Sequence, residues 1–231
     1  SQAALLASLG PQLRHPVNDI ASTAETLAQA LADGGPAEAR RTAQTLRDRA
    51  YRVQDTLRDM LDLAALDTGQ LTLRHDAFDL AETLQQAAVA VRALADKKGL
   101  QLQLQLDDDL GYARGDAQRV GQVLNKLLRH ALDTSPAGTV RLSAERQGST
   151  AADSKLRIDV VDASGGMAPA QLATLFEPWQ AGTPSADGGA LKLAVSQKMA
   201  RLMGGDIVAS SVPQLGCTFT LTLPSDTVVH T

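Results

Sequence analysis

The residues most able to do chemistry in this sequence are histidines and lysines placed to handle phosphoryl groups. His15 lies in a run that predicts a helix, where a neutral imidazole could accept a phosphoryl group. Lys126 and His130 are four residues apart in another predicted helix, so they share a face and could bind phosphate. Lys192 begins a further helix and could do the same. At His15 and Lys192 the alternative, which we favour, is an exposed polar side chain without a role.

His15 belongs to a predicted helical hairpin. Apolar residues recur every three and four positions in two runs, which is typical of the seam of a coiled coil or helix bundle. The segment 33–36, Asp-Gly-Gly-Pro, ends one helix and begins the next. The seam positions are Leu9, Leu13, Val17, Ile20, Ala24, Leu27 and Leu31, then Leu46, Ala50, Val53, Leu57, Met60 and Ala64.

Two such helices cannot bury both apolar faces by themselves. A homodimer through residues 1–68 would form a four-helix bundle and solve the problem. The alternative is that the hairpin packs on its own C-terminal domain. We favour the dimer because the seam is long and heptad-like. The outer face of the second helix is expected to be solvated and carries Arg40, Arg41, Arg47, Asp48, Arg49 and Arg52.

The other candidate residues belong to a predicted second domain, 80–231, which follows a linker over 69–79. Its hydrophobic pattern switches between the period of a strand and that of a helix, as in a sheet layered against helices. The fold class is therefore α+β. The predicted helices span 80–97, 116–135, 168–176 and 191–203, and the strands span 100–106, 139–146, 156–161, 207–211 and 218–223.

Composition excludes several classes of protein. The chain of 231 residues has a net charge of -4 and no basic stretch suited to nucleic acid. Its one cysteine, Cys217, excludes an internal disulfide and is expected to be a small buried residue. No apolar run reaches the roughly 20 residues that cross a bilayer. We expect a cytoplasmic fragment of a longer soluble or membrane-anchored bacterial protein, with no membrane insertion of its own.

The order of hairpin, linker and sandwich resembles the core of a sensor histidine kinase. In that family a dimerisation and phosphotransfer hairpin precedes a Bergerat-type ATP-binding domain. The run Leu175–Trp179 is similar to the family's Phe-Glu-Pro-Phe segment, and 203–219 follows its closing hairpin. The resemblance covers nearly the whole chain and implies a two-component signalling protein.

The family's phosphoacceptor box, His-Glu-Leu-Arg-Thr-Pro-Leu-Asn, is similar to residues 11–18. The acceptor histidine corresponds to Pro11 and the adjacent acid to Gln12, while His15 takes the place of a Thr or Asn. Proline has no nucleophilic nitrogen, so the resemblance implies that the chain is not an autokinase. The residues that align the box are Leu13, Arg14, Pro16 and Asn18.

A second box of the family holds two asparagines that face nucleotide and magnesium. Here they correspond to Lys126 and His130. Because Mg²⁺ takes hard oxygen ligands, neither side chain can replace an asparagine, and no metal site is expected.

The glycine boxes of the family are partly kept. Asp162 corresponds to the adenine-reading aspartate and Gly166 to a glycine of its box, whereas Ser164 replaces the first glycine. In the phosphate-binding box, Ala190 and Lys192 replace two of three glycines, so side chains stand where the backbone should approach phosphate. The lid corresponds to 180–188. The vestigial cofactor-binding positions are Asp162, Gly166, Gly188, Gly189 and Lys192.

The packing pattern is thus intact where the chemistry is lost. We expect a pseudokinase that dimerises and relays signals to a response regulator receiver domain or another histidine kinase. No cofactor is expected, although weak nucleotide binding without magnesium through Asp162 and Gly166 stays open. The alternatives are a phosphorelay protein that uses His15 and a weakly active atypical histidine kinase.

Overall fold

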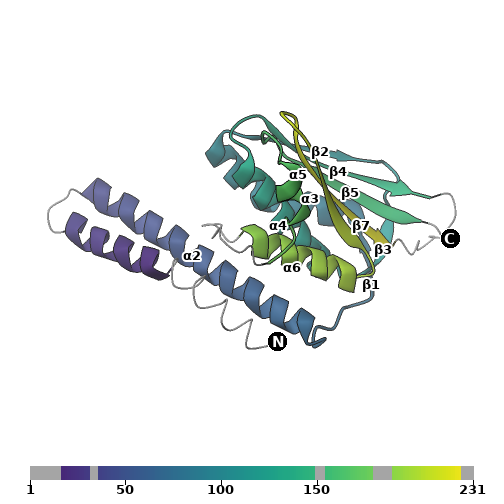
Figure 1. Cartoon of the computed structure of the whole chain (residues 1–231), viewed down its shortest axis with the longest axis horizontal. Helices are drawn as coiled ribbons and strands as arrows, with labels where there is room; N and C mark the ends of the chain where they lie inside the picture. Colours follow the sequence, from purple (N-terminus) through teal and green to yellow (C-terminus); the bar gives the residue numbers. More distant parts are fainter. Residues whose placement is uncertain (1–16, 32–35, 149–153, 179–188, 225–231) are drawn as a thin grey trace.

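The computed structural model describes residues 17–31, 36–148, 154–178 and 189–224. A helical hairpin projects from a two-layer domain (Figure 1). The hairpin consists of a helix over residues 17–31 and the longer α2, Pro36–Asp67. The α+β class and the order of hairpin followed by sandwich, both predicted from the sequence, are confirmed. Pro11, Gln12 and His15 lie outside the described residues.

The two helices of the hairpin are joined by a side chain that we expected to be solvated. Arg49 donates hydrogen bonds from Nη1 to the backbone oxygen of Asp19 at 2.9 Å and to Oγ1 of Thr23 at 2.6 Å. Thr23 is buried, as are Ala30 and Ala39 near the turn. The expectation of a solvated outer face was therefore wrong for Arg49, because the helical period alone does not tell which polar residue faces the neighbouring helix.

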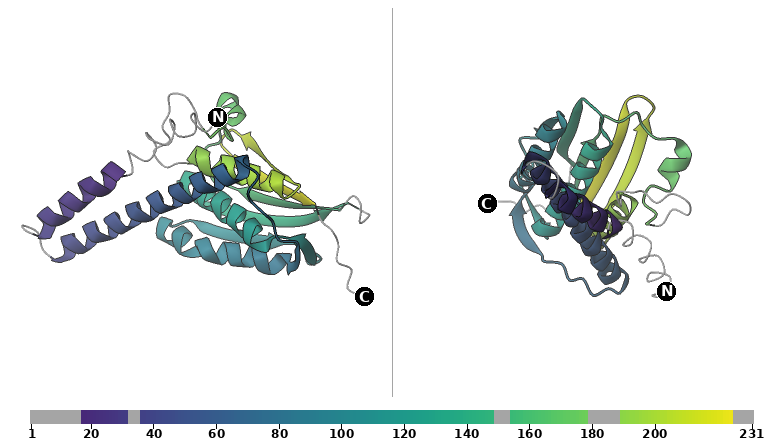
Figure 2. Two further views of the ribbon diagram at one scale, coloured as in Figure 1. Left: turned by 90° about the horizontal axis from the view of Figure 1, so that it is seen from below. Right: turned by 90° about the vertical axis from the view of Figure 1, so that its left-hand side faces the viewer.

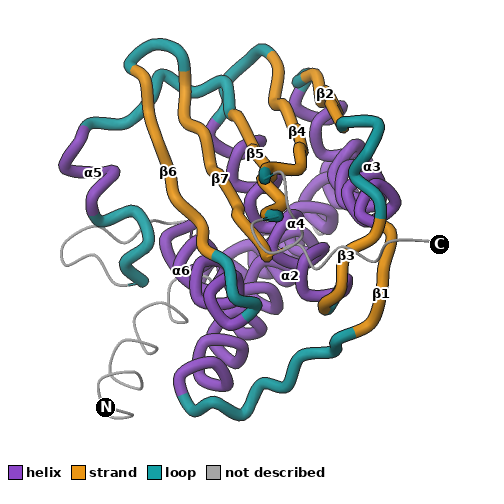
Figure 3. Tube along the Cα trace, turned by 90° about the vertical axis from the view of Figure 1, so that its right-hand side faces the viewer, coloured by secondary structure: helices purple, strands orange, loops and turns teal. Residues whose placement is uncertain are grey.

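The main sheet has the strand order β2-β4-β5-β7-β6. Only β2 and β4 run parallel, and the other neighbours are antiparallel. Figure 3 shows the strands as one layer and helices α3, α4 and α6 as the other. The strands are β2, Gln101–Leu106; β4, Thr139–Gln147; β5, Lys155–Val161; β6, Asp206–Val212; and β7, Gly216–Pro224.

Local signals account for the helix ends. The N-cap of α3 is Asp79, whose side chain accepts from the backbone of Glu82, and Gly99 ends the helix in the left-handed conformation. The N-cap of α4 is Asp116. The predicted helices are found within a few residues of their expected bounds. They are α3, Leu80–Lys98; α4, Ala117–Thr134; α5, Pro169–Ala173; and α6, Gly189–Leu202.

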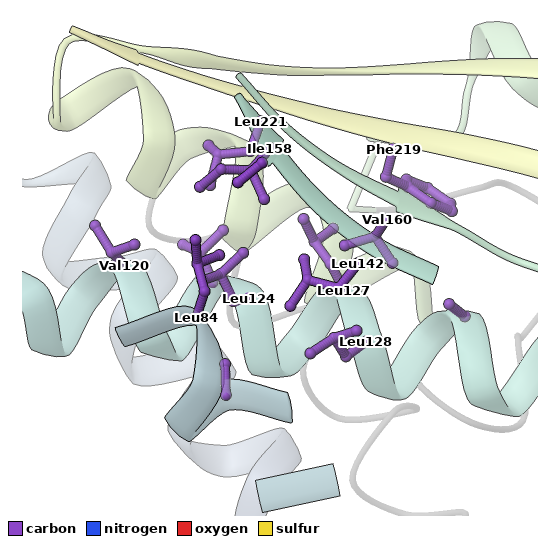
Figure 4. Close-up of a cluster of buried hydrophobic side chains, with 14 of the residues drawn as sticks. Leu84, Val120, Leu124, Leu127, Leu128, Leu142, Ile158, Val160, Phe219 and Leu221 are labelled. Atoms are coloured by element: carbon purple, nitrogen blue, oxygen red, sulfur yellow. The ribbon is translucent and has the colours of Figure 1, made fainter. Parts of the chain in front are cut away.

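The core lies between α4 and the sheet. Leu124 and Leu127 of α4 point toward Ile158 and Val160 of β5, and Leu128 belongs to the same buried cluster (Figure 4). All five side chains are fully buried. Burying a leucine or isoleucine side chain contributes about 1.5–3 kcal/mol, so this layer holds α4 firmly against the sheet.

A small second sheet was not expected. Strand β1, Asp76–Asp79, pairs antiparallel with β3, Tyr112–Gly115. Residues 76–79 were predicted as part of the linker, and β3 was not predicted. Four-residue strands are too short to show a clear period, and only their pairing across the chain defines them.

The C-terminal part of α2 packs against α6 of the same chain (Figure 2). Met60 and Leu63 form a buried apolar cluster with Leu191 and Val195. The alternative in which the hairpin packs on its own C-terminal domain therefore holds for this part of α2. Met60, expected on the bundle seam, instead faces α6. Within the described ranges no helix has both the length and the apolar character needed to cross a membrane.

Candidate functional site

Helix α4 carries the residues that resemble the magnesium-side box, and its start is fixed by Asp116. One carboxylate oxygen of Asp116 accepts from the backbone N–H of Arg119 at 3.0 Å, and the other accepts from that of Arg74 at 3.2 Å. Asp116 is buried, so these two bonds also compensate for the loss of water around its charge. The cap fixes the start of α4, the helix that carries Lys126 and His130.

Asp162, the predicted adenine-reading aspartate, follows β5 and is 2% exposed. Its Oδ1 accepts from the backbone N–H of Cys217 at 2.7 Å and from both the backbone N–H and the hydroxyl of Ser164, at 3.1 and 2.8 Å. Its Oδ2 accepts from Oγ1 of Thr134 at 3.3 Å. Ser164, which replaces a glycine of the family box, thus uses its hydroxyl to bind the carboxylate.

Gly166 has a packing role in this loop. Its φ is +79°, and a Cβ there would lie 2.9 Å from both Oγ of Ser211 and the backbone oxygen of Val212. Ser211 also accepts from the backbone N–H of Met167 at 2.7 Å. The glycine is therefore required for the loop to approach β6, whether or not a nucleotide binds. Cys217 is a free thiol with no exposed surface, which confirms that it is a small buried residue.

His130 occupies the second of the two asparagine positions and points into the domain. Its ring meets Phe219 edge to face, with centroids 5.2 Å apart. Nε2 is buried and finds no hydrogen-bond partner among the described atoms. Burial lowers the pKa of His130 below 6.5, while the nearby Asp162 carboxylate acts in the opposite direction. A Cβ at Gly189 would lie 3.7 Å from Nδ1, so the neutral ring fills the space beside the start of α6.

Lys126 occupies the first asparagine position and turns toward the hairpin. Its Nζ lies 2.5 Å from Oδ1 of Asp59 and 3.9 Å from Oδ2 of Asp62, both on α2. The side chains of Lys126 and Asp59 are 13% and 5% exposed. The position that faces nucleotide in the family therefore forms a buried ion pair between domains in this chain.

Lys192, on α6, adds a second cation to the same carboxylate. Burial raises the pKa of Asp59 above its ordinary 3.8, and the ammonium groups of Lys126 and Lys192 offset part of this rise. Asp55, one turn earlier on α2, adds to the rise. Lys126 and Lys192 thus both act electrostatically on Asp59 of the hairpin.

Asp59, Asp62 and Asp67 of α2 were not predicted as functional residues. Asp62 accepts a hydrogen bond from Nε2 of Gln122 at 2.6 Å, and its other oxygen lies 3.7 Å from Nη1 of Arg119. Asp67 forms an ion pair with Lys198 of α6. The one available signal was the helical spacing of these acids, which places them on a single face of α2.

The predicted cofactor-binding residues that the structure describes lie in two places: Asp162 and Gly166 follow β5, and Gly189 and Lys192 lie in the first turn of α6. Of the two predicted asparagine positions, Lys126 pairs with Asp59 and His130 packs on Phe219. Gly188 and the lid over 180–188 lie outside the described residues. In the part of the chain that is described, no three His, Cys, Asp or Glu side chains are grouped to hold a metal ion.

Comparison with known proteins gives one family match. Residues 115–227 match the model of histidine kinase-, DNA gyrase B-, and HSP90-like ATPases. The chain is 32% identical over 216 residues to Sensor protein DivL of Caulobacter vibrioides, which covers 92% of this chain and 27% of DivL. It spans between 24% and 27% of the length of three of its curated relatives.

Two solved structures share the fold. Histidine kinase AdeS of Acinetobacter baumannii matches with a TM-score of 0.72 and 22% identity over 93% of this chain and 98% of AdeS. Histidine kinase ThkA, solved in complex with response regulator protein TrrA, matches with a TM-score of 0.73 and 17% identity over 96% of this chain and 61% of that one.

Proposed function

From the premise that this chain has the core of a sensor histidine kinase, we propose that it is a two-component signalling module without autokinase activity. It dimerises through residues 1–68 and relays signals by contact with a partner. We expect the module to act in the cytoplasm.

The observation that carries the proposal is the ion pair between Lys126 and Asp59. Metal-assisted phosphoryl transfer needs oxygen ligands for Mg²⁺ beside the phosphates. Lys126 offers no such oxygen, and its ammonium is engaged by Asp59 at 2.5 Å. His130 offers a buried imidazole that packs on Phe219. At the acceptor position, Pro11 has no nitrogen that could carry a phosphoryl group.

Nucleotide binding is also expected to fail. The adenine-side carboxylate of Asp162 is already satisfied by four hydrogen bonds, from Ser164, Cys217 and Thr134. A ligand amino group would have to compete with them, at a net cost of about 0.5–1.5 kcal/mol for each bond displaced. The bond from Thr134 to Oδ2 is the longest of the four, so Oδ2 is where a ligand would compete most easily.

The experiment is calorimetric titration of the full chain with Mg-ATP, and then with ATP in the presence of a chelator. No heat of binding is expected in either titration. Micromolar affinity with Mg²⁺ would overturn the proposal. Binding of ATP only in the presence of the chelator would mean that the protein has lost magnesium binding but not nucleotide binding. Incubation with ATP carrying a labelled γ-phosphate then separates a binding protein from a weakly active atypical kinase.

The partner that the fold suggests is a response regulator receiver domain, and the alternative is another histidine kinase. The solved complex of ThkA with response regulator TrrA supports the first, because ThkA shares the fold over 96% of this chain. A receiver domain that does not bind while a histidine kinase does would favour the second.

A phosphorelay role for His15 makes a separate prediction. A phosphorylated receiver domain mixed with the protein is expected to leave no label on it. Label that appears on the wild type and is lost in His15→Ala would establish phosphotransfer in place of a purely binding role.

A further inference from the structure

We infer that Lys126 and Asp59 are the centre of an interdomain clamp that fixes the register of the ATPase-like domain on helix α2. The clamp also includes Asp62 with Gln122 and Arg119, and Asp67 with Lys198. This goes beyond the proposed function, since it concerns how the two domains are held together and not what either binds.

The clamp residues of the hairpin lie along one face of α2. Asp59, Asp62 and Asp67 alternate with Met60 and Leu63, which are buried against α6. Spacings of three, four and seven or eight residues return to the same side of a helix. The domain therefore meets α2 along a single mixed stripe of acids and apolar residues.

Apolar contact alone would not define the position of the domain along this stripe. The cluster of Met60 and Leu63 with Leu191 and Val195 is small, and apolar side chains tolerate sliding because their attraction has no direction. A shift of one helical turn, roughly 5.4 Å, would leave similar apolar surface in contact. The same shift would separate Lys126 from Asp59 and leave a buried carboxylate unpaired.

The acids of α2 in the clamp each have a basic side chain of α4 or α6 beside them. Asp59 pairs with Lys126 of α4, Asp62 lies beside Arg119 of α4, and Asp67 pairs with Lys198 of α6. Buried ion pairs contribute little net stability, because desolvation offsets their attraction, but they can select one arrangement over its neighbours. The clamp thus fixes the position of the ATPase-like domain along α2. As a result, a rotation or translation of α2 moves the domain with it.

The test compares several variants of the full chain by the width of the distribution of distances between α2 and the ATPase-like domain. Spin labels are attached to cysteines introduced at Gln44 of α2 and Val89 of α3, which are both exposed. Pulsed electron paramagnetic resonance then gives the distribution of the distance between them. Labelled chains are diluted with unlabelled ones, so that pairs within one chain dominate. Cys217 is fully buried and stays unlabelled.

The wild type is expected to give one narrow distance. Asp59→Leu combined with Lys126→Met keeps the contact buried without charge, so this variant is expected to stay folded and to show a distribution at least twice as broad. The exchange of Asp59→Lys with Lys126→Asp is expected to restore the narrow distance. Lys98→Met is the matched control, because Lys98 pairs with Asp133 inside the domain. It should leave the distribution unchanged.

A broad distribution in the wild type, or a narrow one in the uncharged double variant, would overturn the clamp. Circular dichroism of each variant shows that its fold is kept. The measurement is made without nucleotide, so its outcome does not depend on whether Mg-ATP binds, and the two proposals can fail separately.

Discussion

At the scale of single residues, two lysines at positions that resemble the nucleotide boxes of the family act on the contact between α2 and the rest of the chain. Lys126 and Lys192 stand where the resembled family has an asparagine and a glycine, and both direct charge at Asp59. A lysine cannot ligate Mg²⁺, but its long stem reaches α2 and its ammonium balances a buried acid. The two substitutions therefore act on the contact between the domains.

The pH dependence of stability should report on Asp59. Burial raises its pKa above 3.8, so the folded protein binds this proton more tightly than the unfolded chain. The resulting stabilisation is complete below pH 3.8 and is lost as the pH rises through the raised value. The free energy of unfolding of the wild type, measured with urea relative to Asp59→Asn, should therefore rise on acidification through this window.

The charged groups that act on Asp59 are Lys126, Lys192 and Asp55, and Asp62 lies beside the same lysine, Lys126. The Asp59→Asn substitution leaves these four other groups unchanged. The difference in the free energy of unfolding between the two proteins therefore reports the titration of Asp59. A wild type that loses stability relative to Asp59→Asn on acidification would mean that attraction to Lys126 outweighs burial.

At the scale of elements, the start of β7 supports the segment that carries Asp162. The backbone N–H of Cys217 donates to Oδ1 of Asp162, and the backbone N–H of Asp162 donates to the oxygen of Cys217 at 2.9 Å. Gly216 has a φ of +109°, and a Cβ there would collide with the backbone oxygen of Asp162. The glycine lets the two segments approach closely.

Gly216→Ala is therefore expected to lower the free energy of unfolding by more than about 2 kcal/mol, because it combines a strained φ with a collision against backbone. Gly121→Ala is the control: this glycine lies within α4, and a Cβ there would contact nothing within 4 Å. It should raise the free energy of unfolding by ~0.5–1 kcal/mol. Equal effects of the two substitutions in a urea titration would contradict the assigned role of Gly216.

At the scale of the whole molecule, the hairpin leaves apolar side chains exposed in the single chain. Leu57 and Leu61 of α2 are 42% and 70% exposed, and Val17 and Leu31 of the first helix are also exposed. The domain buries Met60 and Leu63 of α2 but leaves these other apolar side chains exposed. Exposed leucines along a helix pair are what a second copy would bury in a bundle, which supports the proposed homodimer.

Leu57→Glu is expected to convert the dimer to a monomer, because a carboxylate in the bundle seam would lose its water without a partner. The readout is the mass from light scattering during gel filtration, with one chain at 24.3 kDa. Leu215→Glu, which changes an exposed leucine between β6 and β7, should leave the mass of the dimer unchanged. A wild type that elutes as a monomer would refute the dimer.

The sequence alone predicted the elements whose signals are local. Helices α3 and α4 have apolar residues at the helical period and an aspartate cap, and both depend only on neighbours within a few positions. The absence of a nucleophile at Pro11 is equally local, because it follows from the covalent structure of one residue. The strands β1 and β3 were missed because four residues do not show a period.

Only the tertiary structure decided which charges meet. Lys126 and Asp59 are distant in the sequence, and nothing in either helix indicates that they pair. The same holds for Arg49, whose partners Asp19 and Thr23 belong to the preceding helix. The physical reason is that the helical period defines a face but not its neighbour. Docking of α4 and α6 on α2 brings Lys126 to Asp59 and Lys198 to Asp67.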